Sequence, residues 1–137
     1  MKNFWIISLI FISLAMWSCN NDDNYSSFHY VGRGIDSISM PDTANLRQRV
    51  EIKTFTQIRQ GCEQFQTHGY DVVGNERTVS VWLIKYDDRE CGENMNIDPS
   101  FYFMPQQTGI YHFRFWAGQD EETDEDIFLT QDIYIRP

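Results

Sequence analysis

The stretch that decides the fold runs from Cys62 to Tyr86 and reads CEQFQTHGYDVVGNERTVSVWLIKY. Two runs rich in β-branched and aromatic residues flank Gly74-Asn75, a dipeptide typical of a two-residue hairpin turn. We expect one strand over Cys62 to Val73 and a second over Arg77 to Tyr86. The segment therefore predicts a long antiparallel hairpin.

Five further strands are expected on either side of this hairpin. Each is a short run of apolar residues, several alternating with polar ones, set between turn-forming residues. These strands cover Ile35 to Met40, Gln48 to Thr56, Phe101 to Met104, Gly109 to Ala117 and Ile127 to Ile135. No stretch shows a convincing helical period. Seven strands at this spacing predict one all-β domain over residues 35–137, an antiparallel two-layer β-sandwich.

The sixth expected strand carries a recognisable pattern. Thr108-Gly-Ile-Tyr-His-Phe113 resembles the sixth strand of immunoglobulin-like domains, where a tyrosine near the strand start forms a corner. The resemblance implies a seven-stranded immunoglobulin-like sandwich. It extends to the fold superfamily alone, since the Cys–Trp–Cys pattern of antibody domains is absent from the sequence.

The second hairpin strand is apolar on both faces. One face carries Val79, Val81 and Leu83, and the other carries Trp82, Ile84 and Tyr86. One set must face the core, and the other is either covered by a neighbouring element or exposed. An exposed face with Trp82 and Tyr86, continued by Trp116, could stack sugars or dock a protein. These three aromatic residues are the candidate binding face.

The first residues have the pattern of an export signal. Lys2 precedes an apolar run from Phe4 to Leu14. At about 1.5 Å per residue, this run is too short to cross a hydrocarbon core about 30 Å thick. We therefore expect a secretory signal peptide over residues 1–18. The alternative is an uncleaved anchor extended by residues 15–17.

Cys19 follows this run and a small residue, and it resembles the lipobox cysteine of bacterial lipoproteins. In that family the sulfur carries a diacylglycerol, and the new amino terminus is acylated with a fatty acid such as palmitate. Met16 and Trp17 depart from the usual box, a looseness that is found among lipoproteins of the Bacteroidota. The resemblance implies a lipid anchor at Cys19 and a flexible tether over residues 19–34.

The resemblance to Bacteroidota lipoproteins also bears on location. Asn20-Asn-Asp-Asp-Asn24 resembles their surface-export signal, although it could simply begin a linker. It implies attachment to the outer membrane, with surface display favoured over periplasmic retention. Further similarity to small lipoproteins of this group lies in Ser39 to Thr43, Gly61-Cys62 and Phe115-Trp116. That similarity implies no activity.

The two remaining cysteines, Cys62 and Cys91, lie in the part expected to be exported, where the environment oxidises thiols. The hairpin turn places Cys62 opposite Asp87, and a small bend after Asp87 would bring Cys91 within reach. A metal site is the alternative, but neither cysteine has another cysteine or a histidine at ligand spacing. The sequence therefore predicts a disulfide.

The charge of the chain limits its partners. The net charge is −9, so nucleic acid and anionic lipid are poor partners. Six carboxylates occupy the seven residues 120–126. Candidate calcium ligands among them are Asp120, Glu122, Asp124 and Asp126. Because the spacing of an EF-hand is absent, the alternative is a solvated loop that keeps a hairpin soluble.

The sequence suggests no catalytic set. His29, His68 and His112 are scattered, and no nucleophile stands near a base, so we expect neither an enzyme nor a cofactor. The expected function is a non-catalytic binding or accessory module, displayed on the outer membrane for a protein or glycan. The alternative is a structural subunit of a larger envelope complex, docking through a strand edge or an apolar face. A small hydrolase would require an active-site cluster that only the fold could reveal.

Overall fold

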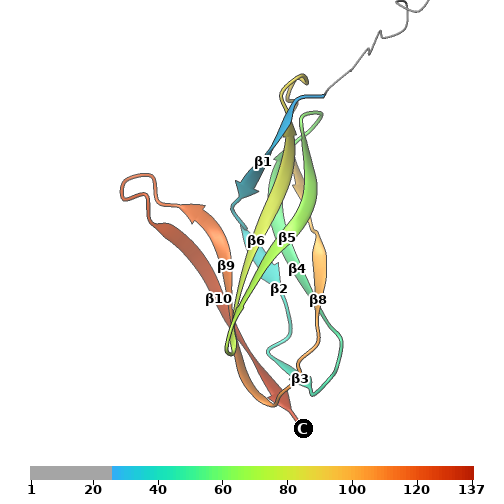
Figure 1. Ribbon diagram of the computed structural model, residues 1–137, viewed down its shortest axis with the longest axis vertical. Coiled ribbons are helices and arrows are strands. Elements are labelled where there is room, and N and C mark those ends of the chain that lie inside the picture. Colours follow the sequence, from blue (N-terminus) through green and yellow to red (C-terminus); the bar gives the residue numbers. More distant parts are fainter. Residues whose placement is uncertain (1–25) are drawn as a thin grey trace, which may run out of the picture.

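The computed structural model describes residues 26–137, which form strands and no helix (Figure 1). No helix that could cross a membrane therefore occurs in this range. The strands are β1 (Phe28–Arg33), β2 (Ser37–Ser39), β3 (Thr43–Asn45), β4 (Val50–Arg59), β5 (Glu63–Val73), β6 (Glu76–Tyr86), β7 (Asn94–Ile97), β8 (Ser100–Phe103), β9 (Gly109–Gln119) and β10 (Asp126–Arg136). The expected signal peptide and Cys19 lie outside the described residues.

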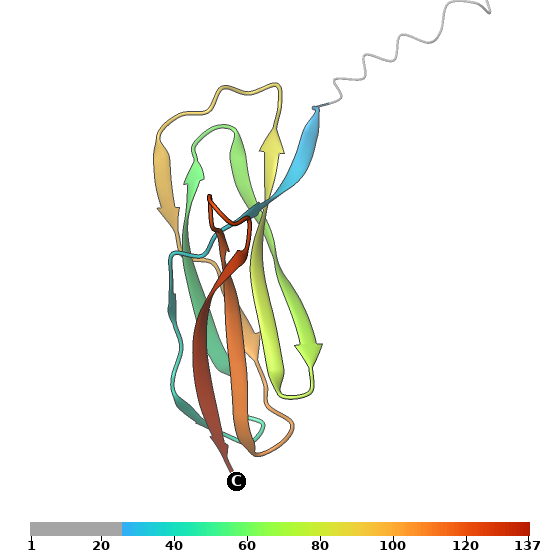
Figure 2. The same ribbon diagram turned by 90° about the vertical axis from the view of Figure 1, so that its left-hand side faces the viewer.

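The strands form two sheets. In the larger sheet the order is β5, β6, β9, β10 and β3, and β1 also pairs with β6. In the smaller sheet β4 pairs with β2, and also with β7 and β8 along consecutive parts of its length. Figure 2 shows the long strands running along the length of the molecule. The expectation of an all-β domain is confirmed.

The hydrophobic core lies between the sheets. Alternation along the strands sends every second side chain inward, which buries one face of β4, β6, β9 and the last part of β10. Phe103 of the smaller sheet packs against Tyr111 and Phe113 of the larger one, with ring centroids 5.1 and 5.2 Å apart. The fully buried apolar residues of the central strands are Ile52, Val79, Val81, Leu83, Phe113, Phe115, Ile133 and Ile135.

The predicted hairpin is confirmed, and its register holds over most of its length. Val73 pairs with Glu76 across the Gly74-Asn75 turn. A bulge between Phe65 and Thr67 then shifts the register by one residue. As a result, the Cys62 carbonyl oxygen accepts the N–H of Tyr86 at 2.8 Å, and Cys62 does not face Asp87 as expected. The predicted disulfide between Cys62 and Cys91 is present, with Cα atoms 4.8 Å apart.

The expectation of seven strands is wrong, because three additional short strands form. They are β1, β3 and β7, and β1 lies within residues 19–34, which were expected to be a tether. Each is fixed by a distant partner: β1 by β6, β3 by β10 and β7 by β4. These pairings give the backbone N–H and C=O groups of the short strands their hydrogen-bond partners. A local sequence pattern does not reveal such partners, because they lie far away in the chain.

The arrangement is also not purely antiparallel. β6 runs parallel to β9, and β10 runs parallel to β3. The chain leaves β6, passes through β7 and β8 in the smaller sheet, and returns as β9. Because this excursion reverses the direction of the chain twice, β9 arrives parallel to β6.

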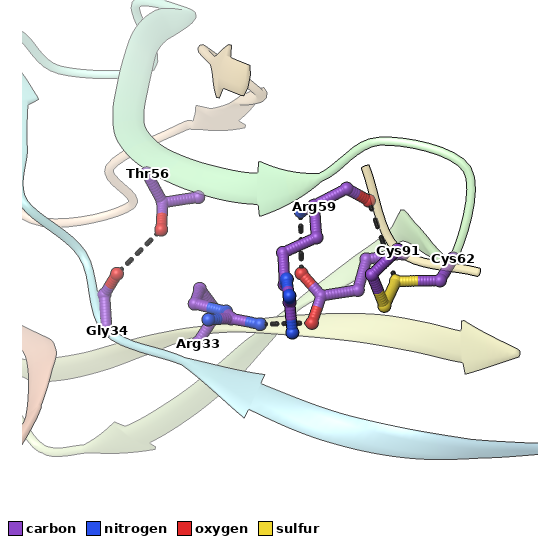
Figure 3. A network of polar contacts seen from close by, with 7 residues as sticks. Arg33, Gly34, Thr56, Arg59, Cys62 and Cys91 are labelled. Carbon is purple, nitrogen blue, oxygen red and sulfur yellow. Dashed lines mark hydrogen bonds and ion pairs between the residues drawn. A yellow bond between two sulfur atoms is a disulfide. The ribbon is translucent and has the colours of Figure 1, made fainter. Parts of the chain in front are cut away.

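A buried ion pair fixes the end of β1 (Figure 3). Arg33 pairs with Glu63, whose side chain is only 3% exposed, and Glu63 also accepts the N–H of Arg59 at 2.8 Å. One residue further, the Thr56 hydroxyl donates to the Gly34 carbonyl at 2.7 Å. These contacts join β1 to β4 and β5 beside the disulfide, so β1 has a defined position on the larger sheet.

Candidate functional site

The larger sheet opens where β6 and β9 separate. The ladder between these two strands begins where Glu76 pairs with His112 and ends where Val79 pairs with Phe115. Beyond that point β1 pairs with β6, and the N–H of Ile35 donates to the Trp116 carbonyl at 2.9 Å. In Figure 1 the β9–β10 hairpin leans away from β6 with β1 between them. A hollow lies on the outer face of the sheet at this junction.

This hollow has a volume of about 280 Å³, and we call it the indole cleft. It is lined by Gly32, Thr78, Ser80, Trp82, Trp116, Asp126 and Phe128. Trp82 comes from β6 and Trp116 from β9, and both rings approach Gly32 of β1. Two of the three aromatic residues proposed from the sequence are thus brought together at one site.

The floor of the indole cleft requires a small residue. Gly32 lies opposite Trp82 in the β1–β6 ladder. A Cβ atom on Gly32 would lie 3.4 Å from Cζ3 of Trp116 and 3.9 Å from Cζ3 of Trp82. A longer side chain would occupy the space between the rings. The absence of a side chain at Gly32 therefore keeps the cleft open.

A β-bulge orients the wall formed by β9 and β10. Phe128 pairs with Trp116, while the preceding Ile127 pairs with Gly118, which leaves Ala117 as the extra residue. Gly118 has a φ of 109°, a conformation that residues with side chains rarely adopt. Bulges of this kind redirect side chains beside functional sites. Here the bulge leaves Ile127 exposed and places Phe128 in the cleft.

Both indole N–H groups are already hydrogen-bonded within the protein. That of Trp116 donates to Oδ1 of Asp126 at 2.9 Å, and that of Trp82 donates to Oγ of Ser80 at 3.1 Å. These bonds fix the orientation of the rings. The ring surfaces are left for contact with apolar groups.

The guanidinium of Arg114 covers part of the neighbouring surface. Its Cζ lies 4.1 Å from the centre of the Phe128 ring, and its Nη1 lies 3.4 Å from a carboxylate oxygen of Glu76. The cation therefore already occupies one face of Phe128. This leaves the two indoles as the aromatic groups best placed to contact a ligand.

Tyr86, the third predicted aromatic residue, lies outside the indole cleft. It sits further along the same face, with its ring centroid 6.2 Å from that of Phe28 and with Arg89 stacked 3.7 Å above it. The structure contradicts the interpretation of β6 as a strand that is buried on both faces. Within the described residues Trp82 remains 41% exposed.

The acidic loop does not gather its carboxylates. Oδ1 of Asp120 accepts the backbone N–H groups of Glu122 and Thr123, and these hydrogen bonds lower the pKa of Asp120. The Asp126 carboxylate instead accepts a hydrogen bond from the indole N–H of Trp116. Over residues 26–137, no three His, Cys, Asp or Glu side chains lie close enough together to hold a metal ion. The four candidate calcium ligands are therefore not brought together.

The histidines have separate structural settings. His29 and His112 form exposed pairs with Asp87 and Asp132, at 2.9 and 2.8 Å. His68 is half-buried and lies 2.9 Å from the hydroxyl of Thr54, and burial lowers the pKa of His68. That hydroxyl is itself buried and donates to the Pro99 carbonyl at 3.2 Å, as expected of a structural group.

Sequence reasoning missed Gly32 and Phe128 as parts of the site. A signal for Gly32 exists, since an isolated glycine within a run such as Phe28 to Arg33 often marks the close approach of another group. Phe128 carries no such signal, because its direction depends on the bulge at Ala117. Comparison of the chain with protein-family models, with curated proteins and with solved structures finds no match.

Proposed function

We propose that this protein is a non-catalytic glycan-binding module, held at the bacterial cell surface by a lipid anchor on Cys19. Its binding site is the indole cleft, where a sugar ring stacks against Trp82 and Trp116. The observation that supports this most directly is the pairing of two indoles over a glycine floor, with both indole N–H groups already satisfied.

The size of the indole cleft suits one ring of a glycan. Its volume of about 280 Å³ lies near the lower limit of ligand pockets, about 300 Å³. Indole rings present a broad apolar surface, which fits the C–H face of a pyranose. Polar groups at the margin would fix the orientation of such a ring. Ser80 and Thr78 supply hydroxyls, and the Asp126 carboxylate can accept further hydrogen bonds.

The charge of the protein favours an uncharged glycan. The net charge of −9 repels acidic polysaccharides at long range. Asp126 and Glu76 add negative charge close to the cleft, while Arg114 is already paired with Glu76. A neutral oligosaccharide avoids the cost of placing like charges together.

The proposed anchor suits display of this site. Ser27, just before β1, accepts the N–H of Asp87, at the end of the molecule that carries the disulfide. The chain therefore enters the domain from that end, and the indole cleft lies on the side of the larger sheet. In this arrangement a lipid on Cys19 leaves the cleft open to extracellular glycans.

Calorimetric titration of the mature chain with a panel of neutral oligosaccharides tests the binding function. Trp82→Ala and Trp116→Ala are each expected to weaken the binding about tenfold, equivalent to ~1.4 kcal/mol. Tyr134→Ala is the matched control, because Tyr134 is a 49% exposed aromatic residue on the same sheet outside the cleft. Equal losses in all three variants, or no binding by the unmodified protein, would contradict the proposal.

The anchor requires its own test. Metabolic labelling with a palmitate analogue is expected to label the protein, and Cys19→Ser is expected to abolish the label. Protease treatment of intact cells should then digest the domain if it is displayed at the surface. A protected domain would place it in the periplasm.

A further inference from the structure

A second and larger hollow lies between edge strands of the two sheets. It has a volume of about 520 Å³ and lies between β5 and β8, which run along the same side of the molecule in Figure 1. We call it the edge groove, and the residues that line it include His68, Tyr70, Val72, Phe101 and Met104. Phe101 forms its base, with its ring centroid 5.0 Å from that of His68 and 5.7 Å from that of Tyr70.

The backbone of β5 is open along this groove. Within the described residues β5 pairs with β6 alone. Residues flanking a two-residue hairpin turn form a hydrogen-bonded pair, and such pairs alternate along the ladder. Counting from Val73 and Glu76, the N–H and C=O groups of Tyr70 and Val72 therefore point away from β6, toward the free edge.

The same residues also supply the wall of the edge groove. The side chains of His68, Tyr70 and Val72 share one face of β5 and line the groove. A strand added to the free edge would therefore carry every second side chain into the groove, over Phe101 and Met104. The residues whose N–H and C=O groups point to the free edge are thus the same residues whose side chains line the groove. This coincidence is what a segment that binds by β-strand addition requires.

The edge groove is positively charged in a negatively charged protein. Arg77 lines it, bonded through Nη1 to the carbonyls of Gly74 and Glu76 at 2.7 and 2.9 Å. Arg49 stacks on Tyr102, with Cζ 3.6 Å from the ring centre. Among residues 26–137, neither arginine has a carboxylate within ion-pair distance, and the groove lining contains no carboxylate.

We propose that the edge groove binds an extended polypeptide segment of a partner protein, which adds to β5 as a further strand. Alternate apolar side chains of this segment fill the groove over Phe101 and Met104. An acidic residue at the end beside Val72 pairs with Arg77, which lines the groove there. This site shares no residue with the indole cleft and does not depend on it.

A second copy of this chain fits the edge groove less well. The only carboxylate on β5 beyond its bulge is Asp71, whose side chain lies on the opposite face from Tyr70 and Val72. A symmetric β5–β5 pair would therefore leave Arg77 without a partner. Each copy also carries a net charge of −9, which opposes self-association. The charges therefore favour a different protein as the partner, one whose bound segment carries a carboxylate that pairs with Arg77.

The test uses the full chain in mild detergent and a fluorescent peptide of about seven residues, a common strand length. The peptide alternates valine and threonine and has aspartate at one end. Binding is followed by fluorescence anisotropy. We expect saturable binding that Tyr70→Lys weakens about tenfold, because the variant removes the ring that packs against Phe101 in the wall of the groove. Tyr134→Lys, which changes an exposed tyrosine on β10, is expected to leave the affinity unchanged.

Two peptide variants separate strand addition from general apolar contact. Methylation of the backbone nitrogens that face β5 is expected to abolish binding. Replacement of aspartate by asparagine is expected to weaken it about threefold, as for a partly exposed ion pair. This preference for aspartate should disappear in Arg77→Gln. The same variant should bind the asparagine peptide as tightly as the unmodified protein does, which shows that the groove is intact.

Three outcomes would overturn the proposal. The first is absence of peptide binding by the full chain. The second is equal binding of the N-methylated peptide, which would leave β5 without a role. The third is a full chain that is dimeric and becomes monomeric with Tyr70→Lys, which would assign the edge groove to a second copy.

Discussion

Gly32 lies directly across from Trp82 in the β1–β6 ladder, where a Cβ atom would lie within 4 Å of the rings of both Trp82 and Trp116. The indole cleft therefore depends on a strand that local sequence patterns place in a flexible tether. Its walls come from β6, β9 and β10, whereas its floor comes from β1.

Replacing Gly32 tests the role of this floor. In Gly32→Val the branched side chain enters the space between the two indoles, and we expect glycan affinity to fall about tenfold. Gly32→Ala adds only a Cβ atom at ordinary contact distance, 3.4 Å from Trp116, and should retain most of the affinity. Calorimetry measures both. If Gly32→Val binds as well as the unmodified protein, the ligand does not enter the cleft.

The ion pair between Arg33 and Glu63 should matter for stability. Arg33→Met leaves the buried Glu63 carboxylate without its counter-charge, so the free energy of unfolding should fall by about 3–5 kcal/mol. The double variant Arg33→Met/Glu63→Leu should recover much of this loss. Lys53→Met is the control, because the Lys53–Asp98 pair is exposed and should contribute less than about 1 kcal/mol. Equal effects of the two single variants in urea denaturation would count against this prediction.

The disulfide should stabilise the end of the domain where β1 begins. Cys62 and Cys91 are separated by 29 residues, and closing such a loop contributes about 3–4 kcal/mol in the chain-entropy model. We therefore expect Cys62→Ala/Cys91→Ala to lower the free energy of unfolding by this amount. Denaturation of the oxidised protein and of the double variant measures the difference. Detection of two free thiols in the oxidised protein by mass spectrometry would refute the bridge.

His68 should make stability depend on pH. Burial lowers the pKa of His68 below its ordinary value of 6.5. As the pH falls through 6.5, the unfolded chain therefore takes up a proton that the folded chain resists, and the free energy of unfolding decreases. His68→Asn should remove this part of the pH dependence, whereas His112→Asn, at an exposed pair, serves as the control. An unchanged slope in His68→Asn would contradict the assignment.

The long strands could be predicted from the sequence because their signals are local. The Gly74-Asn75 turn sets the pairing of β5 with β6, and alternation identifies the buried face of β9. The three short strands could not be predicted in the same way. β1 contains two glycines in or beside it, which suggest flexibility in isolation. In the fold, a Cβ on Gly34 would lie 2.6 Å from the Ala117 carbonyl oxygen, so a contact with a distant part of the chain requires glycine at this position.

The candidate site was predictable only in part for the same reason. The alternation of β9 identifies Trp116 as outward-facing, whereas β6 is apolar on both faces, so the sequence leaves the exposure of Trp82 open. The proximity of the two tryptophans depends on β9 lying beside β6 as a parallel neighbour, which requires knowledge of the path through β7 and β8. The edge groove depends likewise on β5 and β8 lying next to each other across two sheets.

Tryptophan fluorescence of the mature chain tests the central claim most directly. Of the four tryptophans, Trp5 and Trp17 precede Cys19, so the mature protein would contain only Trp82 and Trp116. Titration with a neutral oligosaccharide is predicted to change the emission in a saturable way, and Gly32→Val, which retains both indoles, is predicted to shift the midpoint of this change to about tenfold higher oligosaccharide concentration. Glycan binding detected by calorimetry without any change in emission would show that the ligand binds elsewhere, and would contradict the indole cleft as the binding site.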